Sequence, residues 1–214
     1  MEELIRGVER FRKHVFPAER GLFKELARSQ RPTALMITCA DSRIDPNHLT
    51  QSRPGDLFFL RNAGNFVPAY NTTQGAEAAT VEYAVEVLGI RHIIICGHSD
   101  CGAMRALANQ AGLDRLKSVR SWLEHGSAAL STARAVHGHL EGDAFIRALV
   151  EENVLAQIQH LKTHPSVAAG LRKGTLQVHG WVYEIEHGEV HCYDSQNACF
   201  TSLCCESTQL EALA

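Results

Sequence analysis

Two short segments of this sequence carry residue types that bind metal ions. In the first, Cys39 precedes Asp41 and Arg43, and in the second His98 precedes Cys101. Two thiolates and one imidazole favour zinc over magnesium or calcium, which need hard oxygen ligands. Three protein ligands with a fourth position left open are typical of a catalytic rather than a structural zinc site. The alternative is that the two cysteines are small buried residues and that the histidine is an ordinary core residue.

Both segments follow short apolar runs, which predict buried strands. Residues 34–38 and 92–96 are apolar without alternation, as in strands covered on both faces, and a third such run spans 57–60. Helical spacing over 75–88, and a helix expected from Gly102, alternate with these strands and favour a largely parallel sheet. Open α/β sheets bind ligands beyond the carboxyl ends of their strands. We therefore expect the two segments to meet at one end of the sheet.

The rest of the chain predicts helices on either side of this sheet and strands near its end. Apolar positions in 2–29 have a helical spacing that Pro17 interrupts, which predicts two helices. Residues 113–163 are mainly helical in pattern, and 176–193 predict a late strand and a hairpin. The expected fold class is α/β, with a mainly parallel central β-sheet flanked by helices and an N-terminal helical arm over residues 1–30.

Length and composition favour a single globular domain and disfavour several other classes of protein. A chain of 214 residues favours a single domain over 1–214, and a net charge of -3 gives no electrostatic reason to expect nucleic acid as a partner. A signal peptide and a membrane span are not expected, because no segment has the required apolar run. Seven cysteines, an odd number, disfavour a disulfide framework, so we expect a soluble cytoplasmic protein. Adjacent Cys204 and Cys205 are expected to oxidise easily during handling.

Over nearly its full length the chain resembles the β-class carbonic anhydrases. The matching segments are CADSR at 39–43, RNAGN at 61–65, EYAV at 82–85, GHSDCG at 97–102 and HGWVY at 179–183. The resemblance implies reversible hydration of CO2 to bicarbonate and a proton by attack of zinc-bound hydroxide. It implies one zinc ion per subunit, bound by Cys39, His98 and Cys101. It also implies a dimer in which the N-terminal helices embrace the neighbour, with pairing into a tetramer as a further state.

The same resemblance assigns a catalytic dyad to Asp41 and Arg43. The carboxylate would accept a hydrogen bond from the hydroxide, and the guanidinium would keep it ionised. Asp41 could instead become the fourth zinc ligand if the pair broke. The alternative is a strand-end turn with a structural ion pair. Family members inhibited by bicarbonate carry a tryptophan where this chain has Met36, so we expect the subtype whose site stays open.

The substrate pocket should be apolar, since CO2 is uncharged. By resemblance, Phe58, Tyr83 and Ala63 line it, and Gln30 contacts the substrate across the subunit boundary. The backbone N–H of Gly102, at a helix start, could meet a developing negative charge. Ordinary core positions for the two aromatic residues, and a solvated loop position for the glutamine, are the alternatives.

Two other functions remain open from the sequence. One is hydrolysis of carbonyl sulfide or carbon disulfide on the same scaffold, and the other is non-catalytic zinc binding. Because two thiolates cancel the charge of zinc, the site should acidify water less than an all-histidine site, where the pKa is about 7. We therefore expect activity that rises into the alkaline range. His160 and His164, four residues apart on a predicted helix, are expected to form a surface pair.

Overall fold

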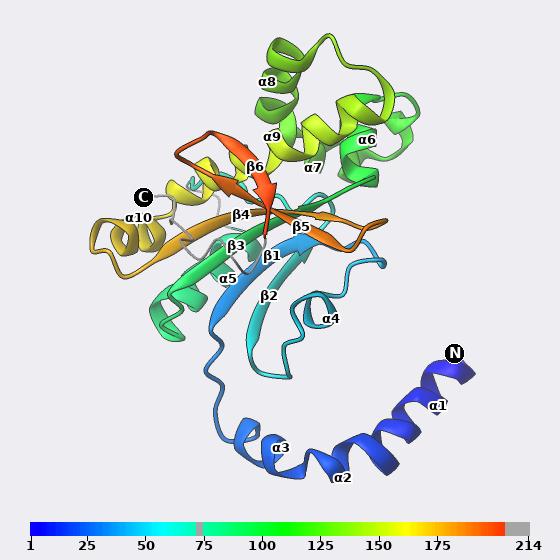
Figure 1. The fold of residues 1–214 in the computed structure, drawn as a ribbon, viewed down its shortest axis with the longest axis vertical. Helices are drawn as coiled ribbons and strands as arrows, with labels where there is room; N and C mark the ends of the chain where they lie inside the picture. The colour runs from blue at the N-terminus through cyan, green and yellow to red at the C-terminus, as the bar shows by residue number, and fades with distance from the viewer. Residues whose placement is uncertain (72–74, 204–214) are drawn as a thin grey trace.

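In a computed structural model of the protein, residues 1–71 and 75–203 are described. At its centre lies a six-stranded sheet in the order β2-β1-β3-β4-β5-β6 (Figure 1). The strands are β1 (Ala34–Cys39), β2 (Leu57–Asn62), β3 (His92–His98), β4 (Gln177–Glu184), β5 (Glu189–Asp194) and β6 (Cys199–Ser202). The first four pair in parallel, and β5 and β6 are antiparallel. The predicted α/β class, with a mainly parallel sheet and a late hairpin, is confirmed.

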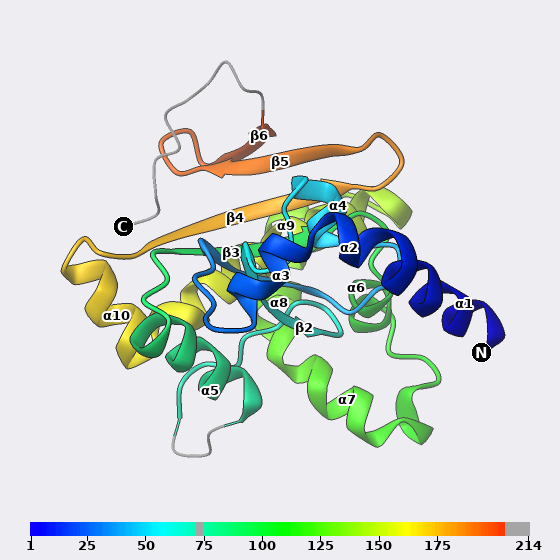
Figure 2. The same ribbon diagram turned by 90° about the horizontal axis from the view of Figure 1, so that it is seen from below.

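Helices precede the sheet, connect its strands and cover it. They are α1 (Glu2–Arg10), η1 (Phe11–Val15), α2 (Phe16–Ala18), α3 (Arg20–Leu26), α4 (Pro46–Thr50), α5 (Ala76–Glu82), η2 (Tyr83–Val87), α6 (Gly102–Ala108), η3 (Leu113–Arg115), α7 (Lys117–Leu123), η4 (Glu124–Gly126), α8 (Ser127–His137), α9 (Gly142–Lys162) and α10 (Pro165–Arg172). Figure 2 shows the sheet nearly edge-on, with α4 on one side and α5, α8 and α10 on the other. The short helix α4 and strand β6 were not predicted from the sequence.

The two faces of the sheet are covered by apolar clusters of different size. Leu35 and Ile37 of β1 point into the larger core, which α9 covers with residues such as Val154. The alternate residue Met36 points to the opposite face, in a small cluster with Ile94 against α4. All six residues of β1 are buried, as the unbroken apolar run predicted. A strand covered on both faces is held rigidly, and β1 ends at a proposed metal ligand.

Two of the predicted helices contain π-helical turns. In the arm, η1 runs directly into α2, so the helix continues through Pro17 and turns at Glu19 instead of at the proline. The N–H of Phe16 bonds to the carbonyl of Phe11 across this wider turn. Proline has no N–H to donate and its ring crowds the preceding turn, which a π turn accommodates. The predicted helix over 75–88 likewise divides into α5 and η2.

The N-terminal arm stands apart from the sheet (Figure 1). Its apolar side chains face solvent in the single chain: Leu4 is 69% exposed and Val8 61%. Phe11, Phe16 and Phe23 pack on one another, with ring centroids 5.4–6.3 Å apart. Among the helices of the described residues, none is long and apolar enough to cross a membrane.

Candidate metal centre and active site

The three predicted metal ligands converge at the carboxyl ends of two neighbouring strands. Cys39 ends β1, His98 ends β3, and Cys101 lies just before α6. One ligand atom from each residue lies within 4.8 Å of the others, and all three residues are at least 95% buried. The parallel pairing of β1 with β3 brings together segments that are about 60 residues apart in the sequence.

The imidazole of His98 is oriented to bind a cation. Its Nδ1 lies 2.9 Å from the carbonyl oxygen of Ser99, so Nδ1–H is the donor and Nε2 carries the lone pair. Nε2 is buried and has no hydrogen-bond partner in the described part of the chain. Buried polar atoms are normally satisfied, and a metal-binding histidine commonly donates its other ring N–H to a carbonyl. A metal ion bound at Nε2 would satisfy this nitrogen.

The two cysteine side chains beside it differ in pKa. Its contact with Cys101 and the hydrogen bond from the Gly64 N–H lower the pKa of Cys39 below its usual range, against the effect of burial. The hydrogen bond to Cys39 and burial in turn raise the pKa of Cys101. A second thiolate therefore needs a cation beside it. This donor set fits a thiophilic divalent ion such as zinc.

Asp41 and Arg43 form a closed pair next to this cluster. Arg43 Nε donates to Asp41 Oδ1 at 3.0 Å and Nη2 to Oδ2 at 2.8 Å, while the backbone N–H of Arg43 donates to Oδ1 at 2.9 Å. These bonds hold the pKa of Asp41 well below its usual range. Asp41 Oδ2 lies 3.9 Å from His98 Nε2. An ionised carboxylate thus lies beside the lone pair of His98 Nε2.

Sequence reasoning missed the groups beyond the 39–43 segment that hold Arg43 in place. Arg43 Nη1 donates to Asp100 Oδ2 at 3.1 Å, and Nη2 donates to the Asp100 carbonyl at 3.0 Å. Arg105 Nε donates to the other carboxylate oxygen of Asp100 at 2.6 Å and its Nη2 to Asp143 at 2.7 Å. The position of Asp100 inside the His98-x-x-Cys101 segment was the available signal.

Arg61 fixes the backbone around the first ligand. Its guanidinium donates to the carbonyls of Cys39, Asp41 and Ile44 at 2.9–3.1 Å. The loop that carries the dyad is therefore tied to β2 by a single side chain. Met36, which the subtype prediction singled out, is fully buried on the face of the sheet opposite to Leu35 and Ile37.

The predicted substrate residues fall into two groups. Ala63 and Gly102 line an apolar cavity of about 550 Å³ over α6 and α7. Phe58 packs against Tyr83, with ring centroids 6.1 Å apart. In the sheet Phe58 pairs with Leu35 of β1, which lies four residues before Cys39. That offset is about 13 Å along a strand. Within one chain these aromatic residues are therefore remote from the metal ligands.

Gln30 lies in the exposed segment between α3 and β1. It lies where the N-terminal arm joins the sheet. The packing of the arm therefore decides whether Gln30 lies near an active site. Its contact with substrate stays a prediction. Cys204 and Cys205 lie outside the described residues.

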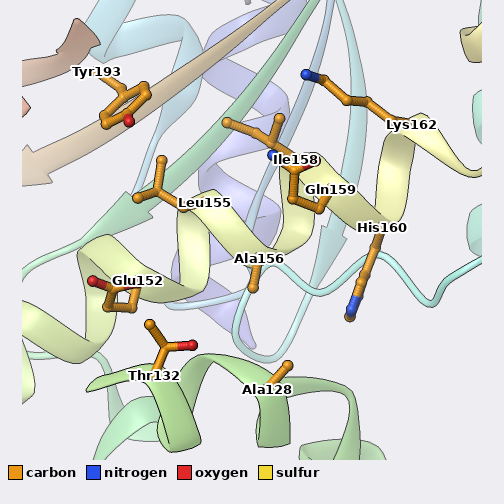
Figure 3. A pocket seen from close by; sticks show the side chains of 10 residues that line it. All are labelled: Ala128, Thr132, Glu152, Leu155, Ala156, Ile158, Gln159, His160, Lys162 and Tyr193. Carbon is orange, nitrogen blue, oxygen red and sulfur yellow. The ribbon is translucent and has the colours of Figure 1, made fainter. Parts of the chain in front are cut away.

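A second, more polar hollow of about 370 Å³ lies between α8, α9 and β5 (Figure 3). Glu152, His160 and Lys162 of α9 line it, together with Thr132 of α8 and Tyr193 of β5. It shares no lining residue with the metal-ligand cluster or the dyad. The hollow is therefore not part of the proposed active site.

The expectation of a surface pair at His160 and His164 is wrong. His160 Nδ1 lies 3.0 Å from the carbonyl oxygen of Val67, and His164 Nε2 lies 3.0 Å from that of Pro68. His164 is only 3% exposed, and burial lowers its pKa. The two rings anchor the loop after β2 to the end of α9 and to the start of α10, a contact between segments more than 90 residues apart.

Comparison with known proteins agrees with this arrangement. The family model "Carbonic anhydrase" matches residues 34–190. A carbonic anhydrase of Pseudomonas aeruginosa is 50% identical over 203 residues, which cover 95% of this chain and 92% of the relative. The β-carbonic anhydrase CcaA superposes with a TM-score of 0.92 at 44% identity, covering 94% of this chain and 91% of that one. One of two tetrameric β-carbonic anhydrases from Sordaria macrospora gives 0.77 at 26% identity, covering 94% and 98%. The chain therefore belongs to the β-class carbonic anhydrase family, whose members are carbonate dehydratases.

Proposed function

We propose that this protein catalyses the reversible hydration of CO2 to bicarbonate and a proton at a zinc ion bound by Cys39, His98 and Cys101. The observation that carries the proposal is the buried cluster of two sulfurs and one Nε2 that has no hydrogen-bond partner among the described residues, with the Asp41 carboxylate 3.9 Å from that nitrogen. Bound zinc would supply a Lewis acid that lowers the pKa of water and so provides a nucleophile for CO2 near neutral pH.

The dyad orients this nucleophile. Asp41, kept ionised by Arg43, is a hydrogen-bond acceptor beside the candidate metal ligands, and it can direct the lone pair of the attacking oxygen towards CO2. Because two guanidinium nitrogens and one backbone N–H hold both carboxylate oxygens, Asp41 is kept from taking the fourth ligand position. The closed pair supports the open-site subtype predicted from Met36.

Substrate would enter through the apolar cavity beside Ala63 and Gly102. A cavity with little polar surface suits an uncharged molecule and disfavours water around it. The remaining predicted pocket residues, Phe58 and Tyr83, could reach such a site only in a neighbouring copy, since they lie about 13 Å down the sheet in their own chain. Tyr83 is 43% exposed and so is available for such a contact.

The helical arm supports assembly from at least two copies. Its exposed apolar residues form one face of α1, and surfaces of this kind mark protein interfaces. We propose a dimer in which residues 1–30 of each copy pack against the other, placing Gln30 near the neighbour's site. The similar β-carbonic anhydrases from Sordaria macrospora are described as tetrameric, which supports the pairing of two such dimers into a tetramer. Residues 1–214 would then form a single domain with an exchanged arm.

Stopped-flow CO2 hydration by the zinc-loaded protein tests the proposed function. We expect hydration well above the buffer rate, together with about one zinc ion per subunit. Cys101→Ser should lose zinc and activity together, because a hydroxyl is a poor zinc ligand in this setting. Cys199→Ser, at an exposed cysteine on β6, is the matched control. A metal-replete wild type without hydration activity would contradict the proposal.

A further inference from the structure

The peptide unit that joins Ala63 to Gly64 is held at both of its polar atoms. Its carbonyl oxygen accepts a hydrogen bond from the indole Nε1–H of Trp122 at 2.8 Å. Its N–H donates to the sulfur of Cys39 at 3.4 Å. A continuous chain therefore runs from the indole through one peptide group to a predicted metal ligand. Hydrogen bonds in such chains polarise one another, so the indole strengthens the donor that faces the sulfur.

Trp122 is itself fixed in place. It lies near the end of α7, where its ring meets Phe66 edge-on at 6.0 Å and His125 at 5.0 Å. The following residue, Leu123, is 3% exposed and anchors the helix in the core. An aromatic side chain with two rotatable bonds and two ring contacts holds its N–H in one direction. The indole is thus a rigid donor aimed at the loop after β2.

The next peptide unit along is held by α9. Asn153 Nδ2 donates to the Gly64 carbonyl at 3.0 Å, and Gln157 Nε2 donates to Asn153 Oδ1 at 3.0 Å. Asn153 is 1% exposed and Gln157 is fully buried, so these bonds form away from water. Gly64 has φ +85°, and a Cβ there would lie 2.9 Å from the ring of Phe66. The glycine lets the backbone turn so that its N–H faces the sulfur.

We propose that Trp122 is a positioning residue of the metal centre, which acts by orienting the Gly64 N–H onto the Cys39 thiolate. The proposal rests on the metal site of the proposed function. It assigns Trp122 a role beyond the wall of the apolar cavity that it also lines. A hydrogen bond to a metal-bound thiolate withdraws electron density from the sulfur, and second-sphere partners of this kind tune the metal they surround.

Cobalt(II) in place of zinc makes the sulfur environment visible. Cobalt bound by thiolates absorbs in the near ultraviolet through sulfur-to-metal charge transfer, and the energy of this band falls when a hydrogen bond to the sulfur is lost. Trp122→Phe keeps an aromatic ring but removes the N–H. Site-specific incorporation of β-(benzothien-3-yl)alanine at position 122 keeps the size and shape of the indole and also removes the N–H. Val119→Ala, on the same helix and lining the same cavity, is the control.

We expect the charge-transfer band of both position-122 proteins to move to longer wavelength, with zinc-supported turnover lower by roughly 10-fold or more. Val119→Ala should keep the wild-type band. Circular dichroism and light scattering establish that each protein is folded and assembled as the wild type is. An unshifted band in the folded benzothienyl protein would overturn the proposal.

The test separates this inference from the proposed function. A shifted band in a protein whose wild type does not hydrate CO2 would support the role of Trp122 and contradict the assigned reaction. Normal hydration by the wild type, with an unshifted band in the position-122 proteins, would support the assigned reaction and contradict the role of Trp122. A cobalt-loaded wild type without any thiolate band would contradict both.

Discussion

Replacing Asp41 by asparagine tests the dyad most directly. The carboxylate accepts three hydrogen bonds from Arg43, two from the guanidinium and one from the backbone N–H. An amide of the same size keeps only one acceptor oxygen and turns an NH2 group towards guanidinium donors. The substitution therefore removes at least one hydrogen bond and the negative charge beside the candidate metal ligands.

The expected losses of stability and of activity differ in size. The side chains of Arg43 and Asp41 are 43% and 17% exposed, so solvent weakens their attraction, and the pair should contribute about 1 kcal/mol to the free energy of unfolding. A positioned proton acceptor typically contributes about 100-fold or more to turnover. A 100-fold loss corresponds to about 2.7 kcal/mol in the activation barrier. Asp41→Asn should therefore lose activity far more than stability.

Stopped-flow hydration, zinc content and thermal unfolding measured on one preparation distinguish the two effects. Asp114→Asn is the control, because Asp114 also pairs with an arginine, Arg120, at 3.2 Å but is 90% exposed. We expect the control to behave as wild type in all three measurements. Near-normal turnover by a fully zinc-loaded Asp41→Asn protein would refute the catalytic role of the dyad and leave it a structural ion pair.

Three further predictions concern assembly and pH. Val8→Asp, on the exposed apolar face of α1, should lower the assembly mass measured by light scattering, whereas Glu9→Ala on the same helix should not; an unchanged mass for Val8→Asp would contradict the exchanged arm. Burial, with a smaller effect of His92, lowers the pKa of His179 to about 4, while the unfolded value is about 6.5. The unfolded chain thus binds a proton that the folded chain does not, so the free energy of unfolding should fall by about 2 kcal/mol from pH 7 to pH 5 on account of this group. Measured by urea unfolding, this fall in the free energy of unfolding should be smaller for His179→Gln than for the wild type. His187→Gln, in the exposed turn before β5, should show the same fall as the wild type. Equal falls in all three proteins would exclude His179 as the cause. Hydration activity should rise from pH 6 to pH 9, because two thiolates leave zinc a weaker acid than three histidines do; a flat profile would contradict this ligand set.

The sheet and the metal cluster could be predicted because their signals are local. An apolar run without alternation, as in β1 and β3, has few stable places in a protein other than a strand covered on both faces. Asp41 and Arg43 are two residues apart, so one turn of backbone suffices to pair them. The strand ends then place Cys39 and His98 together through parallel pairing alone.

The supports of the site could not be predicted because their partners are distant in the sequence. Trp122 and Ala63 are 59 residues apart, and Arg43 and Asp100 are 57 apart. Asn153 and Gln157 interrupt the apolar pattern of α9, and only the packed loop shows that they bond to Gly64 and to each other. His160 and His164 looked like surface residues for the same reason, since nothing local indicates that the loop after β2 packs where α9 ends and α10 begins.

By itself, the sequence determined the residue types of the candidate ligands and the strands that precede them, because these depend on residue chemistry and on short-range periodicity. The pairing of Asp41 with Arg43 was an expectation from the family resemblance. Only the tertiary structure decided which atoms of these residues face one another. It oriented His98 Nε2 towards the sulfurs, tied Arg43 to Asp100 and aimed the Gly64 N–H at Cys39. It also separated Phe58 and Tyr83 from the metal ligands of their own chain. Such directions arise from the packing of helices against a completed sheet, which no short segment encodes.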